Sequence, residues 1–384
     1  MPRQQSLIPL KTLLFSFHAT NTIMISFLPL YLAFKGLNGT EIGWVLAVGP
    51  LASIISQPVW GYLSDKYKTV KWMIVICIIG LICSSLIFFQ MEHLQTILLV
   101  GAILYFFSSP VGALADSLGQ RQADDLNVSF GTIRTWGSLG FAVSALLIGE
   151  LLEQIGIQYM VWPYVIIGSF ALLISFRLAD VHVDTTPIRL SDVRKLLQNK
   201  SFVIFLLLMM FLTITHRTND SFIGLYMTSI GGSEKLVGLV WFVGVISEAA
   251  VFALGAFWFR KFPSLVFVII AGLLYTIRWF LYATFADPVI IIILQVLHGL
   301  TFGVFYLAAF DFITRAIPKL LQSTGHLIFY SVFFGVSGII GSVSGGFIFE
   351  HYSGNMLYFL NGCLALVGTI SFVIFYVRQK RTAM

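Results

Sequence analysis

The sequence predicts an all-α membrane protein with twelve transmembrane helices in two pseudo-symmetric six-helix bundles. Its composition is the first reason: 58% of the 384 residues are hydrophobic and 10% are charged, against roughly 25% charged in soluble proteins. The second is a series of apolar runs of about 20 residues, the length of a helix that crosses a bilayer. Most of the chain is therefore expected to lie in the lipid bilayer, with no separate soluble domain.

The twelve spans are bounded by Gly, Pro, Asn and charged residues. They are expected near residues 10–34, 41–63, 72–90, 96–118, 129–152, 158–179, 201–229, 236–259, 264–285, 288–314, 323–349 and 355–377. The first run contains Lys11 and His18 and no small-residue cleavage site, so we expect a retained helix and not a signal peptide.

The basic residues predict the orientation. Of the 23 Lys and Arg residues, 18 lie at one set of span ends and only Lys35 and Lys235 at the other, while Arg134, Arg217 and Arg278 lie inside spans. Cytoplasmic loops are rich in Lys and Arg, so both termini are expected in the cytoplasm and the protein in the cell (plasma) membrane. The net charge of +6 follows from this topology, and the basic residues form no continuous face for nucleic acid.

A polar stretch at residues 180–200 falls between the sixth and seventh spans. It is expected to be a cytoplasmic linker between an N-terminal bundle, residues 1–179, and a C-terminal bundle with a short basic tail, residues 201–384. Weak internal repeats agree, because shifts of 195 and 198 residues align glycines of the first hairpin and of the fifth helix in the two halves. Two parallel six-helix repeats are typical of transporters.

The sequence argues against an enzyme or a metal protein. Cys77, Cys83 and Cys363 all lie in apolar runs, so neither a disulfide scaffold nor a Cys-x-x-Cys zinc site is expected. There is also no metal triad and no Ser/His nucleophile pair. We expect no enzymatic activity, no cofactor and no metal.

Charged side chains inside spans are the best candidates for function, because each costs about 3 kcal/mol in hydrocarbon and needs a partner, a water-filled cavity or a role. Asp116 in the fourth span and Arg134 at a matching depth of the fifth are expected to meet across an antiparallel hairpin. The pair could bind a polar substrate by bidentate hydrogen bonds, or only lock two helices together. Phe141, farther along the fifth span, is a candidate for stacking on a substrate ring.

The C-terminal half contains a cluster of titratable residues. His216 and Asp220 are four residues apart and share a helix face. Glu248, Arg278 and His298 come from three consecutive spans and are expected to reach a common site, with Glu248 next to Arg278. Such a cluster could carry protons or form a static ion network.

The segment Gly61-Tyr62-Leu63-Ser64-Asp65-Lys66-Tyr67-Lys68, followed by Lys71, resembles the signature loop of the major facilitator superfamily. The resemblance implies a gate, in which Gly61 lets two helices meet. Asp65, followed by the basic Lys66, would cap a neighbouring helix and pair with cations in one access state. The matching segment from Gly255 to Lys261 keeps the glycine and the basic pair but lacks the acid.

Within that superfamily the chain resembles the lactose permease group, with its nucleoside and phenylpropionate permeases, over nearly its whole length. Phe130-Gly131, Arg134 and Gly137-Ser138-Leu139-Gly140-Phe141 resemble the fifth-helix motif of this group, and Asp116 stands where the group has its sugar-binding carboxylate. The resemblance implies that Asp116, Arg134, Ser138 and Phe141 bind the substrate.

The same resemblance implies that Glu248, Arg278 and His298 belong to the coupling cluster. Thr301 stands where the lactose permease has its proton-carrying carboxylate, so Glu248 or Asp220 would have to carry the proton.

The predicted function is secondary active transport: import of a small organic solute with protons, by alternating access, as a monomer. Asp116 favours a neutral, hydroxyl-rich solute such as a sugar or a nucleoside, whereas an aromatic acid would use Arg134 for its carboxylate. Two alternatives stay open. One is an exporter of drugs or metabolites by proton antiport, although the fifth span lacks the proline common in such exporters; the other is a non-transporting membrane sensor.

Overall fold

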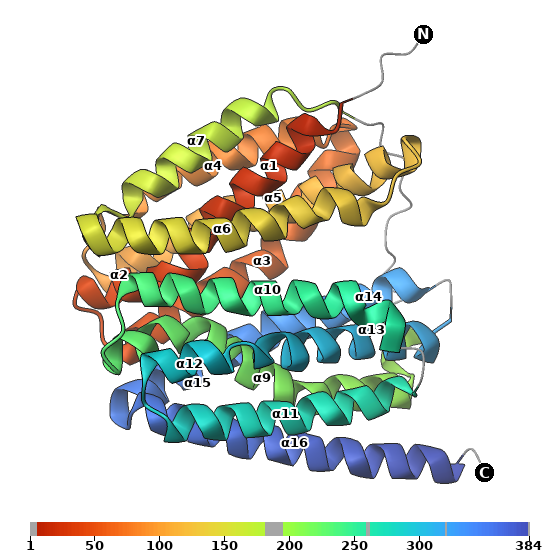
Figure 1. Cartoon of the computed structure of the whole chain (residues 1–384). Coiled ribbons are helices and arrows are strands. Elements are labelled where there is room, and N and C mark those ends of the chain that lie inside the picture. The colour runs from red at the N-terminus through yellow and green to blue at the C-terminus, as the bar shows by residue number, and fades with distance from the viewer. Residues whose placement is uncertain (1–5, 181–194, 259–261, 319–320, 383–384) are drawn as a thin grey trace. The chain divides into compact units, whose positions relative to one another are not determined.

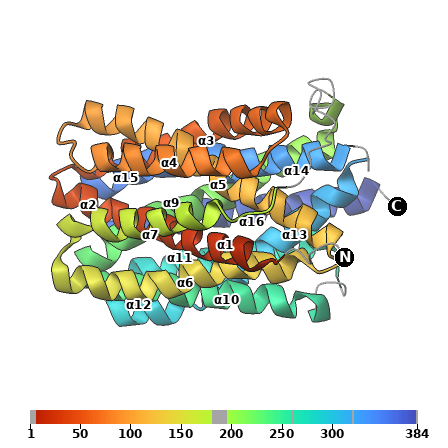
Figure 2. The ribbon, with the colours of Figure 1, turned by 90° about the horizontal axis from the view of Figure 1, so that it is seen from above.

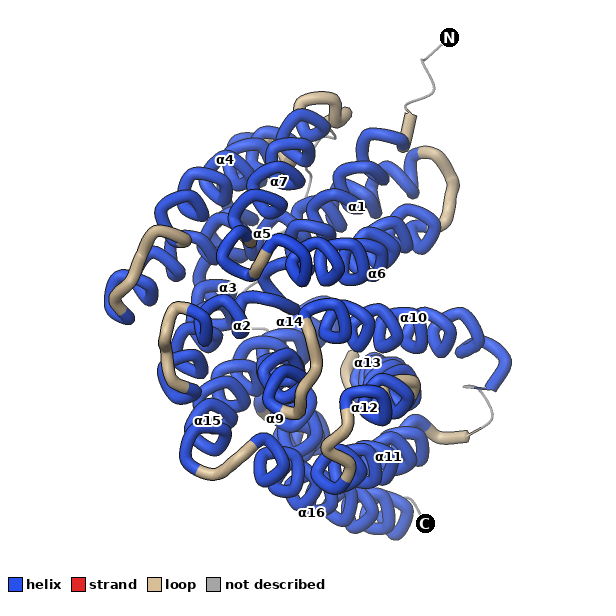
Figure 3. Tube along the Cα trace, turned by 60° about the vertical axis from the view of Figure 1, so that its left-hand side comes forward, coloured by secondary structure: helices blue, strands red, loops and turns tan. Residues whose placement is uncertain are grey.

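The computed structural model describes residues 6–180, 195–258, 262–318 and 321–382. In this part of the chain every regular element is a helix and there is no strand (Figure 3). Twelve helices are long and apolar enough to cross a membrane, which confirms the predicted number of spans. Residues 181–194 of the predicted linker and the basic pair Arg260 and Lys261 lie outside the described residues.

The first six spans run from residue 8 to residue 175. The first span consists of α1 (Ile8–Thr22), a π-helical turn η1 (Ile23–Phe27) and α2 (Leu28–Phe34). It is followed by α3 (Gly39–Tyr67), α4 (Lys71–Phe88), α5 (Leu94–Asp125), α6 (Phe130–Ile155), and a short 3-10 turn η2 (Ile157–Tyr159) leading into α7 (Val161–Ser175).

The last six spans begin with α9 (Lys200–Ser229), α10 (Glu234–Trp258) and α11 (Ser264–Thr284). The tenth span is broken into α12 (Pro288–Leu294), the π-helical turn η4 (Gly299–Gly303) and α13 (Val304–Ala316). The eleventh is broken into α14 (Gln322–Tyr330), the π-helical turn η6 (Ser331–Val336) and α15 (Ser337–His351), and α16 (Gly354–Thr382) completes the set.

Polar side chains cap the first turns of several helices. Asn38 accepts a hydrogen bond from the Glu41 amide while the Glu41 carboxylate accepts one from the Asn38 amide, a capping box at the start of α3. Asn199 caps α9, and Asp287 caps α12. Such caps satisfy backbone amides that the first helical turn leaves without partners.

Several helices extend beyond the predicted spans, and α5 and α3 are two of them. The fourth span was expected to end at residue 118, but α5 continues to Asp125. The expected signature loop is also mostly helical, since α3 includes Gly61, Asp65 and Lys66. The helix ends at Tyr67 and is followed by Lys68, which has a left-handed φ of 52°. Hydropathy marks where a helix leaves the lipid, whereas the backbone hydrogen bonds continue until a residue breaks them.

The chain divides into two compact units. Unit 1 comprises Met1–Thr186 and Ser233–Phe242, and unit 2 comprises Pro187–Gly232 and Val243–Met384. Within unit 1, α1 packs against α6 and α7 (Figure 2). Within unit 2, α16 packs against α11 and α9 (Figure 1).

The contact between α1 and α6 depends on glycine. A Cβ atom added to Gly140 of α6 would lie 2.2 Å from the backbone oxygen of Phe15 in α1. Because the obstacle is backbone, no side-chain rotation can relieve it, and only glycine permits this approach. The close contact places the polar residues of α1 beside those of α6.

Candidate functional site

Asp116 and Arg134 meet in unit 1, as the sequence predicts. Asp116 comes from α5 and Arg134 from the first turns of α6, and Arg134 Nε lies 3.2 Å from Asp116 Oδ1. More than a third of each side chain is exposed, 37% for Arg134 and 36% for Asp116. The pair is thus only partly enclosed, so polar atoms of both side chains can form hydrogen bonds with a bound molecule.

His18 of α1 is a third member of this site. A Cβ atom on Gly137 would lie 2.2 Å from His18 Cδ2 and 2.6 Å from Arg134 Nη1, so both side chains cross directly over this glycine. His18 Nε2 is shielded from solvent and makes no hydrogen bond in the described structure. Residue spacing could not reveal His18, because α1 and α6 are more than one hundred residues apart.

Ser138 and Phe141 follow Arg134 by four and seven residues on α6, a spacing that puts all three on one helix face. The side chains of Ser138 and Phe141 are both partly exposed. The Phe141 ring lies 5.7 Å, centroid to centroid, from the ring of Trp241, which belongs to the same unit. The backbone oxygen of Phe141 accepts a hydrogen bond from Thr22 of the first span.

Unit 2 brings the two predicted residues of α9 together and adds a third. His216 Nε2 lies 3.4 Å from Asp220 Oδ2, and Arg217 Nη1 lies 2.8 Å from the same oxygen. The Arg217 guanidinium also lies over the ring of Phe334, 5.6 Å from its centroid. Arg217 is an intramembrane charge that was not predicted to belong to the cluster, although its i,i+3 spacing from Asp220 is a recognisable signal.

The cluster continues from α9 to the broken tenth span. His216 stacks face to face on Phe302, with centroids 4.6 Å apart, and its ring lies 5.5 Å from that of His298. His298 Nε2 in turn lies 3.7 Å from Glu248 Oε2 of α10. Glu248, His298, His216 and Asp220 therefore form a sequence of neighbouring titratable groups across unit 2.

Arg278 of α11 is fully buried and its partners differ from the prediction. We expected Glu248 next to Arg278, but the described residues contain no ion pair between them. Arg278 Nη2 donates to Gln295 Oε1 at 2.6 Å and Nη1 donates to Thr301 Oγ1 at 3.0 Å. Nη1 also lies 3.5 Å from His298 Nδ1, and His298 in turn contacts Glu248, so this histidine links Glu248 to Arg278.

Gln295 and Tyr282 are functional candidates that sequence reasoning missed. Gln295 Oε1 accepts hydrogen bonds from Arg278 and from the Tyr282 hydroxyl, at 2.6 and 2.5 Å. Gln295 stands where α12 ends, just before the π-helical turn that carries Thr301. Neutral polar residues in an apolar run give no charge signal, although π-helical turns are frequent at functional sites.

The predicted gate residues lie in the last turns of α3. Asp65 and Lys66 are exposed, and a Cβ atom on Gly61 would meet no atom of the described residues within 4 Å. The close helix approach expected at Gly61 is therefore not present in this conformation. The start of α4 is capped instead by Asp180, whose Oδ1 accepts from the Val70 and Lys71 amides at 3.0 and 3.2 Å.

The chemistry available to these residues is hydrogen bonding, ion pairing and proton exchange. In the described parts of the chain, no group of three His, Cys, Asp or Glu residues is arranged to hold a metal ion.

Comparison with known proteins agrees with this architecture. Residues 7–360 match the MFS_1 like family. An uncharacterized transporter, YwbF, of Bacillus subtilis (strain 168) is 29% identical over 362 residues, covering 92% of this chain and 89% of the relative. The maltose permease of Geobacillus stearothermophilus is 24% identical over 350 residues, covering 90% of this chain and 88% of that protein.

Among solved structures, the crystal structure of the nucleoside transporter NupG is similar with a TM-score of 0.87. It is 17% identical in sequence, and the match covers 96% of this chain and 98% of that one. The match to NupG, an MFS transporter, shows the fold, and the family match covers more than nine-tenths of the chain. The protein therefore belongs to the MFS_1 like family and is a multi-pass, non-enzymatic membrane transporter with the major facilitator fold.

Proposed function

We propose that this transporter imports a small, neutral, hydroxyl-rich solute together with protons, by alternating access. The observation that carries the proposal is the Asp116 and Arg134 pair, which is close enough to be one site yet remains more than a third exposed. A carboxylate accepts hydrogen bonds and a guanidinium donates them, so neighbouring hydroxyl groups of a sugar or a ribose match both. Similarity to a maltose permease and to a nucleoside transporter supports the same solute classes.

Ser138 and Phe141 are proposed to complete the solute site. Both share the helix face of Arg134, with the hydroxyl suited to a polar contact and the ring suited to stacking on an apolar sugar face or a nucleobase. An aromatic acid would instead place its carboxylate on Arg134 and leave Asp116 without a role. For this reason the neutral solute is favoured.

Proton coupling is proposed for the titratable residues of unit 2. Glu248, His298, His216 and Asp220 are consecutive neighbours, and Arg278 and Arg217 supply positive charge beside them. A carboxylate that gains and loses a proton within such a cluster changes the charge balance of the site. Glu248 is the proposed carrier because Asp220 already accepts a 2.8 Å bond from Arg217.

We also propose the predicted organisation: functional halves at residues 1–179 and 201–384, a linker at 180–200, and a monomer in the plasma membrane with both termini cytoplasmic. Gly61, Asp65 and Lys66 are proposed to act as a gate in a different access state from the one described. Asp180 holds the adjoining end of α4 and would keep the α3–α4 turn in place during this change.

A pulse experiment tests the proposal. Weakly buffered, de-energised cells that express the protein receive pools of disaccharides, nucleosides and aromatic acids in turn, while external pH is recorded. Symport predicts a transient alkalinisation with one pool, and its absence in cells with Arg134→Ala. A matched control, Glu150→Gln, removes a carboxylate from an exposed ion pair of α6 and should respond like the unmodified protein. Solute entry without alkalinisation would refute proton coupling, and solute-driven acidification would support antiport.

A further inference from the structure

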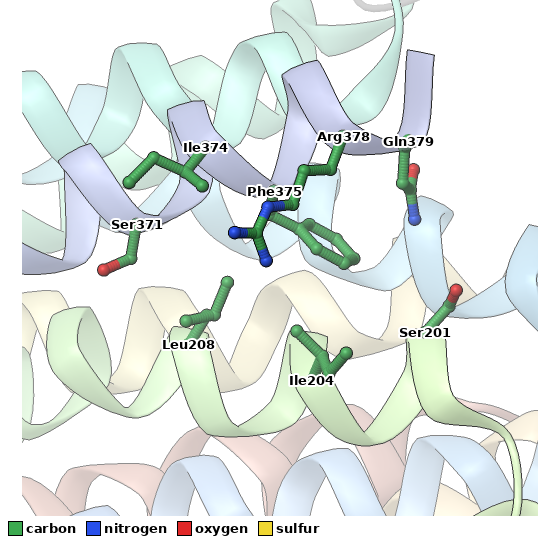
Figure 4. Close-up of a pocket in the computed structure, with 8 residues that line it drawn as sticks. All are labelled: Ser201, Ile204, Leu208, Ser371, Ile374, Phe375, Arg378 and Gln379. Carbon is green, nitrogen blue, oxygen red and sulfur yellow. The ribbon is translucent and has the colours of Figure 1, made fainter. Parts of the chain in front are cut away.

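Two neighbouring pockets lie at one end of unit 2, away from the charged cluster. The first has a volume of about 610 Å³ and lies between Ser201, Ile204 and Leu208 of α9 and a set of α16 residues that includes Ile374 and Arg378. Figure 4 shows the Arg378 guanidinium in the gap between these helices, with Ile204 and Leu208 on the opposite side.

The second pocket is also about 610 Å³ and shares Ser201 and Gln379 with the first, so the two are adjacent. It adds Arg315 and Lys380 to the lining. Arg315 pairs with Asp311, at 2.9 Å from Nε to Oδ2, and its charge is largely offset. Arg378 and Lys380 add two more basic side chains, and no Asp or Glu is among the described residues that line the two pockets.

Polarity changes along the first pocket. Ser201, Arg378 and Gln379 lie where α9 begins and α16 ends, whereas Leu208 and Ile374 are aliphatic and lie deeper along the spans. The deeper Ser371 donates its hydroxyl hydrogen bond to the Val367 backbone oxygen of its own helix. Seven residues of helix separate Ser201 from Leu208, which is about 10 Å at 1.5 Å per residue. This distance matches the step from the headgroup region of a bilayer to its hydrocarbon. A ligand that fits has a negative group at one end and an aliphatic chain behind it.

We propose that these pockets form a binding site for an anionic phospholipid of the cytoplasmic leaflet. The lipid phosphate contacts Arg378 and Lys380, and one acyl chain lies along Ile204, Leu208 and Ile374. Basic pockets among transmembrane helices on the cytoplasmic side are suited to anionic headgroups. The inference uses the membrane orientation proposed above but neither the solute nor the coupling ion, so it can fail while the transport proposal holds.

Native mass spectrometry of the whole protein tests the site. The purified protein in a mild non-ionic detergent is incubated with dioleoyl phosphatidylglycerol or with phosphatidylcholine of the same chains. We expect one phosphatidylglycerol to be retained at least fivefold more than phosphatidylcholine. The double variant Arg378→Gln, Lys380→Gln should lose this preference. Arg177→Gln, which removes an exposed cation after α7 in unit 1, should keep it.

A second variant distinguishes lipid binding inside the pocket from attraction of the lipid headgroup to surface charge. Ile204→Trp fills the pocket and leaves every charge in place, and the Ile204 side chain is 43% exposed, so the variant is expected to fold. It should also lose the retained lipid. Equal retention of the two lipids, or unchanged retention in Ile204→Trp, would overturn the proposal. Displacement of the lipid by millimolar glycerol 1-phosphate would show an anion site without an acyl-chain component and would likewise contradict it.

Discussion

Arg134 Nε lies 3.2 Å from Asp116 Oδ1 while both side chains remain more than a third exposed. Arg278, by contrast, is fully buried and bound by neutral groups. The two arginines therefore have different roles. Arg278 is held in a rigid network, whereas Arg134 is paired and still accessible. Half-exposed ion pairs contribute about 1 kcal/mol or less to stability, so a purely structural role accounts poorly for two charges at this position.

Removing either charge of this pair should affect transport far more than stability. Asp116→Asn and Arg134→Gln are expected to lower initial uptake at least about tenfold, since a hydrogen bond to a charged group is worth roughly 1.5–3 kcal/mol. The unfolding free energy should change by about 1 kcal/mol or less. Labelled-solute uptake and thermal melting of the same preparations check both expectations. Glu150→Gln, which breaks the exposed pair with Lys235, is the matched control and should change neither.

Gly137 is expected to matter for the site, not for the fold. A Cβ at this position meets His18 and Arg134 side chains at 2.2 and 2.6 Å, and both can move aside. Gly137→Ala should therefore displace the Arg134 guanidinium and lower uptake while the protein melts normally. Normal uptake in Gly137→Ala would show that the packing of the His18 and Arg134 side chains over this glycine does not matter for transport.

Two other glycines give opposite expectations for stability. At Gly140 the added Cβ meets the Phe15 backbone at 2.2 Å, so Gly140→Ala should force α1 and α6 apart and destabilise unit 1 by about 1–3 kcal/mol, as overpacking does. At Gly61 the added Cβ has no atom of the described parts of the chain within 4 Å, and Gly61→Ala should stabilise the helix by roughly 0.5–1 kcal/mol. Thermal melting distinguishes them, and a destabilised Gly61→Ala would mean that the described conformation is not the one present in detergent.

Gln295 should be essential to the Arg278 network. In Gln295→Leu, a buried guanidinium and the Tyr282 hydroxyl lose their shared acceptor, at a cost of about 1–3 kcal/mol. We expect a lower melting temperature together with reduced transport. Gln154→Leu removes an exposed glutamine of α6 that bonds Glu150 and should change stability by about 0.5 kcal/mol or less. If Gln295→Leu and Gln154→Leu had the same melting temperature, the role given to Gln295 in the Arg278 network would be wrong.

The pH dependence of uptake should depend on Glu248. In symport the proton enters with the solute, so lowering external pH is expected to increase uptake by the unmodified protein. Glu248→Gln keeps the shape of the side chain but cannot carry a proton, and its uptake should equilibrate the solute without accumulation and respond little to pH. Accumulation against a gradient in Glu248→Gln would assign the carrier role elsewhere, first to Asp220.

Sequence reasoning recovered the parts of the structure that local signals encode. Apolar runs gave the twelve spans, and charges in those runs identified Asp116, Arg134, His216, Asp220 and His298 as residues with partners. Span ends were less accurate, because α5 and α3 remain helical after their hydropathy falls, through Asp125 and Tyr67.

Contacts between distant helices could not be predicted in the same way. His18 meets Arg134 only because Gly140 lets α1 and α6 approach, and Gln295 binds Arg278 from the end of a broken helix. Gln295 carries no charge that marks it as costly in lipid, and the partner of His18 lies more than one hundred residues away in the sequence. Glu248 was placed next to Arg278 because opposite charges attract, whereas neutral groups occupy the positions around the guanidinium.

Solute accumulation in proteoliposomes tests the central claim most directly. Purified protein is reconstituted, a labelled solute from the pool that responds in cells is added outside, and a pH gradient, acidic outside, is imposed. Coupled import predicts transient accumulation above the external concentration that vanishes with a protonophore and is absent in Arg134→Ala. Entry that only reaches the external concentration, with or without the pH gradient, would contradict proton-coupled import.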